Sequence, residues 1–109
     1  RLQKIFAGEI EKSSNELARD FLKGSRVKRL AIAKKMADDI KDEKRTRTEA
    51  RLLIEGIEEF LYEKARSGGT PSEILFRNLE MCRDYISDPS ASVKMLLEYV
   101  ALVTPEEVL

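Results

Sequence analysis

The run from Val93 to Val103 constrains the fold more than any other part of the chain, because nine of its eleven residues are apolar. Its two charged residues, Lys94 and Glu98, are four positions apart, so they occupy one narrow strip of a helix. A helix that is apolar on its other faces must be surrounded by its own domain, by a partner or by lipid. Lipid is disfavoured because a membrane span needs about 20 apolar residues. The run therefore predicts either the central helix of a bundle or a helix held between its own domain and another subunit.

Four further stretches carry apolar residues at every third or fourth position, and no stretch alternates as a strand would. Start signals support this pattern. Ser25 is an expected N-cap, Thr46 and Thr48 are candidate N-caps, and Thr46 with Glu49 fits a capping box. Asp88 with Pro89 is expected to open the last helix. The expected helices cover residues 2–22 (kinked or divided at 13–15), 26–42, 46–66, 70–86 and 89–103. The sequence thus predicts an all-α fold, a single five-helix bundle spanning residues 1–109.

The same spacing predicts which side of each helix is buried. In the second helix the expected stripe is Val27, Leu30, Ala33, Ala37 and Ile40, with Met36 beside it. In the fourth helix it is Ile74, Leu75, Asn78, Leu79, Cys82, Tyr85 and Ile86. Gly24 is expected to end the first helix in the left-handed conformation, and Gly56 is expected to allow close packing against another helix. The fully charged linker 42–45 is expected to be solvated.

Composition limits the classes of function. Twenty basic and twenty acidic residues give a formal net charge of zero, so no overall field attracts the chain to nucleic acid or to an anionic membrane. One cysteine, Cys82, is typical of a reduced, cytoplasmic protein rather than of a disulfide framework. The sequence shows neither a signal peptide nor a spanning segment. Because the helical pattern is already present at Arg1, we expect a piece of a longer chain.

Residues that commonly carry catalysis are scarce. The chain has no histidine, a single cysteine cannot build a zinc site, and the glycines form no phosphate-binding loop. The acid pairs at 38–39, 58–59 and 106–107 point about 100° apart on a helix, so we interpret them as solvated faces rather than catalytic pairs. Cys82 falls on an apolar stripe and is expected to be a buried core thiol. We therefore expect a non-enzymatic domain with no cofactor, metal or small-molecule ligand.

Two basic clusters point to an alternative function. One comprises Lys23, Arg26, Lys28, Arg29, Lys34 and Lys35, and the other comprises Lys41, Lys44, Arg45, Arg47 and Arg51. Because phosphate contact needs only lysine and arginine, the candidate phosphate contacts are Arg26, Lys28, Arg29, Lys34 and Lys35. Acidic residues interleave with both clusters, and no aromatic residue lies among them to stack on bases. A solvated surface is the preferred interpretation, and contact with DNA or with an acidic partner is the alternative.

The run from Tyr85 to Tyr99 is similar to the end of bacterial DNA polymerase III clamp-loader subunits, especially delta prime. In that family the last helix follows a polar pair, often asparagines, and continues with a basic residue and a leucine-rich stretch. Ser90 and Ser92 stand at the asparagine positions, Lys94 stands at the basic position, and residues 96–98 (Leu-Leu-Glu) match the rest. Upstream, residues 17–25 look like the opening helix and glycine turn of the same domain, and residues 50–62 fall where its long third helix does. The resemblance covers nearly the whole chain, while the serines leave delta prime, delta and gamma-related subunits as alternatives.

This resemblance implies a collar domain, one of the C-terminal helical domains that hold five subunits in a ring, with ATP-binding and zinc-binding modules earlier in the chain. It implies a non-catalytic assembly role in sliding-clamp loading for DNA replication. The partners would be other clamp-loader subunits, and DNA would be contacted only indirectly or weakly. The expected subunit contacts are Val93, Met95, Tyr99, Leu102 and Val103. Two rival hypotheses are a helical nucleic-acid-binding domain that uses the second helix, and a helical adaptor with a peptide groove between helices.

Overall fold

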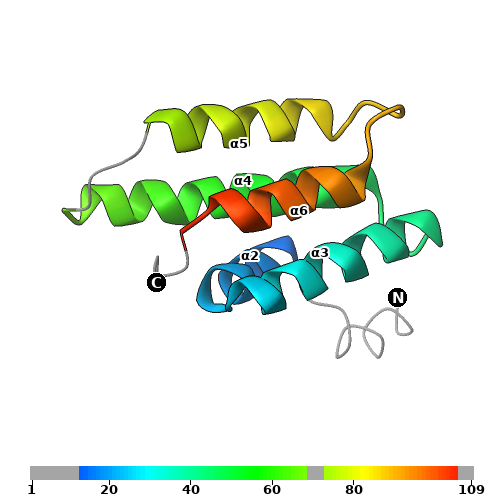
Figure 1. The fold of residues 1–109 in the computed structure, drawn as a ribbon, viewed down its shortest axis with the longest axis horizontal. Helices are drawn as coiled ribbons and strands as arrows, with labels where there is room; N and C mark the ends of the chain where they lie inside the picture. The colour runs from blue at the N-terminus through cyan, green and yellow to red at the C-terminus, as the bar shows by residue number, and fades with distance from the viewer. Residues whose placement is uncertain (1–12, 69–72, 106–109) are drawn as a thin grey trace.

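The computed structural model describes residues 13–68 and 73–105, and every regular element within them is a helix. These helices are α2 (Ser14–Lys23), α3 (Arg26–Lys41), α4 (Arg47–Arg66), α5 (Glu73–Tyr85) and α6 (Val93–Val103) (Figure 1). The predicted all-α, five-helix bundle is confirmed. The predicted start of the first helix, the predicted opening of the fourth helix at residues 70–72 and the acid pair at 106–107 lie outside the described residues.

Two helix pairs organise the bundle, because α2 packs mainly on α4 and α3 packs mainly on α6. α5 lies against α4 and α6, and Figure 1 shows it along one edge of the bundle, with α3 on the other side of α6. Apolar side chains from all five helices form one cluster between them. Its fully buried members include Phe21 of α2, Ile54 of α4, Leu79 of α5 and Leu97 of α6.

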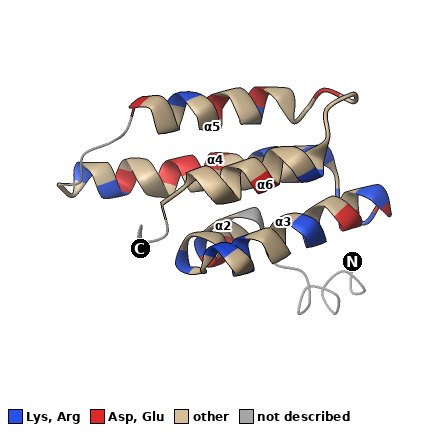
Figure 2. Ribbon diagram, viewed as in Figure 1, with Lys and Arg blue, Asp and Glu red and all other residues tan. Residues whose placement is uncertain are grey.

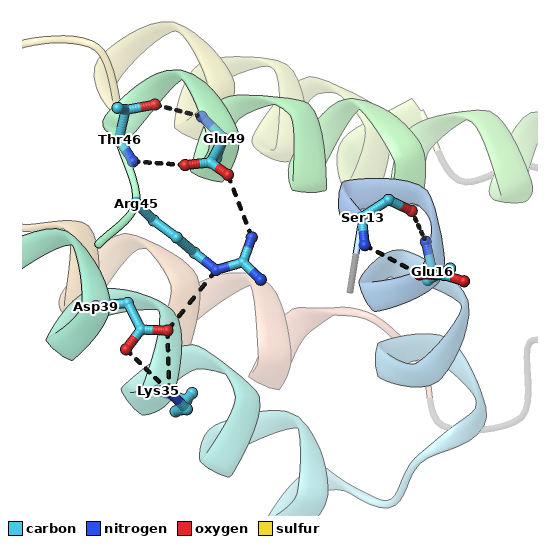
Figure 3. A network of polar contacts seen from close by, with 7 residues as sticks. All are labelled: Ser13, Glu16, Lys35, Asp39, Arg45, Thr46 and Glu49. Atoms are coloured by element: carbon cyan, nitrogen blue, oxygen red, sulfur yellow. Dashed lines mark hydrogen bonds and ion pairs between the residues drawn. The ribbon is translucent and has the colours of Figure 1, made fainter. Parts of the chain in front are cut away.

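Polar side chains begin the helices where the sequence supplies local caps. Ser13 and Glu16 form a capping box at α2, and Thr46 and Glu49 form another at α4 (Figure 3). In each box the hydroxyl accepts a hydrogen bond from the glutamate amide, and the glutamate carboxylate accepts one from the N-cap amide. Ser25 caps α3, as predicted. The polar stretch at 13–15 therefore marks the beginning of a helix.

Helix α6 begins later than the sequence predicts. Its N-cap is Ser92, whose hydroxyl accepts a hydrogen bond from the Met95 amide at 3.2 Å. Asp88 instead accepts hydrogen bonds from the amide and the hydroxyl of Ser90, both at 2.9 Å, and these hold the pKa of its carboxyl below the ordinary value. The predicted N-cap role of Asp88 and helical position of Pro89 were therefore wrong, because local hydrogen bonding keeps both residues in the turn before α6.

Arg47, the first residue of α4, fixes the turn between α5 and α6. Its guanidinium donates hydrogen bonds to the carbonyl oxygens of Ile86, Asp88 and Pro89 at 2.9–3.2 Å. The start of one long helix is thus tied to the connection between two others, which restricts how α6 enters the bundle.

Gly24 ends α2, but not in the predicted left-handed conformation. Its φ of −83° and ψ of 163° are extended. A Cβ at this position would lie 2.9 Å from the Cβ of Lys28 and 3.2 Å from the carbonyl oxygen of Asp20. The glycine is therefore required for space, because the first turn of α3 comes close to the last turn of α2.

Three side chains predicted to be buried are exposed instead: Val27 (78%), Ile74 (70%) and Tyr85 (56%). In α3 the exposure of Val27 accompanies the burial of a polar side chain. Arg29 lies on the other side of the helix from Val27 and is completely buried. The rest of the expected stripe of α3 packs in or against the core, so Val27 alone departs from it.

Arg29 joins the C-terminal ends of two helices that are far apart in the sequence. Its guanidinium donates hydrogen bonds to the carbonyl oxygens of Phe21 and Leu22, in the last turn of α2. It also donates to the carbonyl oxygens of Thr104 and Pro105, which follow α6. Carbonyl groups at helix C-termini lack intrahelical partners and carry partial negative charge, so a buried cation is well placed there. The predicted phosphate contact at Arg29 was therefore wrong, since the side chain is enclosed by the fold.

We expect Arg29→Lys to lower the free energy of unfolding by about 3 kcal/mol, because an ammonium cannot reach carbonyl groups of both helix ends and leaves buried acceptors unpaired. Urea denaturation followed by circular dichroism measures the change. Lys28→Met alters the exposed neighbouring side chain and is the control, with an expected change below about 0.5 kcal/mol. Equal losses in the two variants would show that the carbonyl contacts contribute little.

Two carboxylates interpreted as solvated are buried in ion pairs. Asp39 of α3 is 7% exposed and contacts Lys35 at 2.9 Å and Arg45 at 3.7 Å (Figure 3). Arg45 also contacts Glu49 of α4 at 3.4 Å and is 9% exposed. The linker 42–45 was thus predicted wrongly at its last residue, because Arg45 joins the end of α3 to the start of α4.

The second buried carboxylate is Glu58 of α4, which is 5% exposed and accepts a hydrogen bond from Arg83 of α5 at 2.9 Å. Burial raises the pKa of Glu58 above its ordinary value, and the neighbouring Arg83 only partly opposes this effect. The pair fixes one side of α5 against α4. Cys82 lies in the same helix and is buried, as predicted.

The raised pKa of Glu58 predicts a pH-dependent stability. The folded state binds the proton of Glu58 more tightly than the unfolded chain does. The contribution of Glu58 to the free energy of unfolding is therefore greatest below the ordinary pKa of 4.5, and it declines as pH rises through the pKa of the folded state. We expect the free energy of unfolding of the wild type, minus that of Glu58→Gln, to decrease from about pH 4 to about pH 7. Urea denaturation across this range tests it, with Glu59→Gln as the exposed control. A difference that increases with pH would contradict the expectation.

Candidate protein-interaction face

Helix α6 buries one side and exposes the other. Its buried side consists of Val93, Leu97, Val100 and Ala101. On the opposite side Met95, Tyr99 and Leu102 are 69%, 39% and 52% exposed, at spacings of four and three that place them in one row. The domain therefore encloses only part of this strongly apolar helix.

A second exposed apolar row runs along α5. Ile74, Met81 and Tyr85 are 70%, 47% and 56% exposed, and spacings of seven and four place them on one side of the helix. The sequence prediction assigned Ile74 and Tyr85 to the core and did not single out Met81. These three residues lie on a different side of the helix from Leu79 and Cys82, which are buried, but helical spacing alone does not show which side is covered.

The electrostatic neighbours of α6 show how its row is oriented. The pKa of Asp38 in α3 is lowered, mainly by a hydrogen bond from Lys34 and also by the charge of Lys94 in α6. The Lys94 edge of α6 therefore faces α3. The opposite edge carries Leu96 and Val103, which are half-buried.

The contacts of α5 orient the second row in the same way. Arg83 binds Glu58 of α4, and the ring of Phe76 stacks on Tyr62 of α4 with centroids 4.2 Å apart. This side of α5 faces α4, and the exposed row lies on the opposite side of the helix. Figure 1 shows α5 and α6 as neighbours joined by a short connection. We name the exposed rows of these two neighbouring helices together the α5–α6 apolar face: Ile74, Met81, Tyr85, Met95, Tyr99 and Leu102.

The predicted subunit contacts fall in three places. Met95, Tyr99 and Leu102 belong to the α5–α6 apolar face. Val103 is half-buried at its edge, and Val93 is 6% exposed within the core. Val93 is therefore enclosed by the domain and is not available to a partner.

Few charges interrupt this face on α6. Figure 2 shows α6 mainly in the colour of uncharged residues, whereas charged residues recur along α3, α4 and α5. The charged residues of α6 itself, Lys94 and Glu98, lie 4.0 Å apart and neutralise each other. Contiguous exposed apolar residues beside polar ones are typical of protein-interaction sites.

The five candidate phosphate contacts do not form one cationic surface. Arg29 is buried, while Lys34 and Lys35 each pair with the aspartate four residues later, at 3.0 and 2.9 Å. Arg26 is engaged in another interaction. Lys28 is exposed and forms no ion pair with the residues that the structure describes. These arrangements leave little support for a phosphate-binding helix.

The arginines of the second basic cluster are similarly occupied. Arg45 pairs with Asp39 and Glu49, and Arg47 donates to the carbonyl groups of the α5–α6 turn. Arg51 pairs with Glu55 at 3.1 Å. The arginines of this cluster therefore stabilise the fold.

The described residues offer few groups for chemistry. Cys82 is 2% exposed, and burial raises the pKa of its thiol. Within residues 13–68 and 73–105, histidine, cysteine and acidic side chains form no group of three suited to a metal ion. Over the same residues, every helix is too short or too polar to cross a membrane. The α5–α6 apolar face is thus the most distinct candidate site.

Matched substitutions on the two sides of α6 test its orientation. We expect Leu97→Asp to unfold the domain, because burying an unpaired carboxylate costs several kcal/mol. Met95→Asp, on the exposed row, is expected to change the free energy of unfolding by less than about 1 kcal/mol. Circular dichroism with urea denaturation measures both. A folded Leu97→Asp variant would show that Leu97 is not a core residue.

Relatives give no independent guide to this face. No family model, curated protein or solved structure matches the chain. Its interpretation therefore depends on the geometry and chemistry of the residues themselves.

Proposed function

We propose that this chain is a non-catalytic subunit-assembly domain of a bacterial DNA polymerase III clamp loader. The α5–α6 apolar face binds a neighbouring subunit and helps to hold the ring together while the sliding clamp is loaded during DNA replication. The other clamp-loader subunits are the partners, in the cytoplasm, and delta prime is the subunit that the chain resembles most.

The observation that carries the proposal is the exposed apolar row of α6. Burial of a tyrosine and two long apolar side chains against a partner removes that surface from water, at about 25 cal/mol per Å² of apolar area. Tyrosine is also enriched among the residues that dominate binding energy at interfaces. The resemblance of residues 85–99 to the last clamp-loader helix supports the proposal that the partner is a clamp-loader subunit.

A ring requires contacts of a particular symmetry. Heterologous contacts join two different surfaces, and they close into a ring when the rotation between subunits permits. The α5–α6 apolar face supplies one such surface, so a different surface of the neighbouring subunit is its complement. The rival nucleic-acid-binding function is less well supported, because most of the candidate phosphate contacts are buried or already form other interactions.

We expect Tyr99→Ala to weaken binding to the neighbouring clamp-loader subunit about 30-fold, which corresponds to about 2 kcal/mol for a central interface tyrosine. Its effect on the free energy of unfolding of the isolated chain is expected to be below about 1 kcal/mol. Multi-angle light scattering of the chain mixed with the other clamp-loader subunits of the same organism detects the complex. Isothermal titration calorimetry with the subunit that binds then measures the dissociation constant.

Val27→Ala is the matched control, because Val27 is exposed and apolar but lies on α3. It is expected to leave binding unchanged. Equal losses of binding and stability in Tyr99→Ala would place Tyr99 in the domain core. A wild-type chain that binds none of the clamp-loader subunits would contradict the proposed family role. If the chain instead self-associates through Tyr99, the α5–α6 apolar face remains an interaction surface, but the clamp-loader role is contradicted.

A further inference from the structure

A groove of about 870 Å³ lies between α2, α3 and the linker that follows α3. No residue of α5 or α6 lines it, so it is separate from the α5–α6 apolar face. Its size is within the range of about 300–1,000 Å³ that is typical of ligand sites, which suits a few side chains of a partner. Its lining residues are Leu17, Asp20, Lys23, Gly24, Ser25, Lys28, Ala31, Ile32, Lys35, Met36, Asp39, Lys44 and Arg45.

The apolar part of the groove comes from both helices. Leu17 of α2 and Ile32 and Met36 of α3 contribute large apolar side chains, and Ala31 contributes a small one. Leu17 and Ile32 are only partly buried, although both pack against the core. A ligand that covers them therefore gains apolar contacts without any rearrangement of the core.

The charges around the groove are unbalanced. Asp39 is neutralised by Lys35 at 2.9 Å and by Arg45 at 3.7 Å, as Figure 3 shows. The other lining carboxylate, Asp20, is already engaged in an interaction. Lys23, Lys28 and Lys44 are exposed, and none of them forms an ion pair with the residues that the structure describes. Three lysines without anionic partners thus border an apolar surface.

Nucleic acid fits this combination poorly. Among the residues that the structure describes, the lining contains no aromatic side chain on which a base could stack. A peptide that combines large apolar side chains with carboxylates matches both parts of the groove. Such segments commonly bind by placing their apolar side chains in a groove between helices.

We propose that the α2–α3 groove binds an acidic amphipathic segment of a partner protein. Its apolar side chains contact Leu17, Ala31 and Ile32, and its carboxylates pair with Lys23, Lys28 and Lys44. This site would give the domain a second partner, whether or not the α5–α6 apolar face joins clamp-loader subunits.

The test uses the full 109-residue chain and a fluorescein-labelled 14-residue probe, with Leu at helical spacing on one face and Glu elsewhere. Fluorescence anisotropy is expected to show saturable binding. The double variant Lys28→Glu/Lys44→Glu is expected to weaken it about tenfold, because it replaces two attractive charges with repulsive ones. Lys64→Glu, an exposed lysine of α4 outside the groove, is the matched control and is expected to change binding less than about twofold.

Amide chemical shifts locate the probe. Perturbations at Gly24, Ala31 and Ile32 are expected, whereas perturbations confined to α5 and α6 would overturn the assignment. The inference would also be overturned by equal binding of a probe with Lys in place of Glu, which would leave only an apolar contact. If a 14-residue oligothymidylate binds more tightly than the acidic peptide and its binding depends on the lysines, the groove would be assigned to nucleic acid instead. If no probe binds at millimolar concentration, the groove is not a binding site.

Discussion

The bundle depends on one buried cation. Arg29 bridges the C-terminal end of α2 and the residues that follow α6, elements separated by most of the chain. Its position satisfies carbonyl groups that have no partner within their own helices, at the two places where the helix dipoles are negative. The arginine also lies against the Phe21 ring, with its guanidinium carbon 5.5 Å from the ring centroid. Because Arg29 is buried, Val27 on the opposite side of α3 is exposed.

Helix α6 shows how a strongly apolar sequence is divided between two tasks. One side of the helix supplies core residues such as Leu97, and the other side presents Met95 and Tyr99 to the surroundings. The packing of α3 and α5 on its flanks leaves the outer side open. The α2–α3 groove differs in kind, because its apolar residues are bordered by lysines. The two surfaces therefore favour partners of different chemistry, one mainly apolar and the other acidic.

The features that the sequence predicted are local ones. The caps at Ser25 and Thr46 involve residues three positions apart, and the five helices follow from spacings of three and four. The burial of Arg29 depends on carbonyl groups up to 76 residues away, so no local pattern reveals it. The outer row of α6 was partly predicted, because its apolar residues exceed what one core face needs. Its α5 counterpart was missed, since helical spacing alone does not show which apolar side meets a neighbour.

The lone cysteine gives the domain an internal reporter of its own opening. Cys82 lies on the buried side of α5, and its raised pKa keeps the thiol protonated and unreactive while the helix is packed. Modification of the thiol therefore requires α5 to separate from α4 and α6. The Glu58–Arg83 ion pair must break in the same movement. The rate at which a thiol reagent labels the native protein thus measures how often this part of the bundle opens, without any engineered probe.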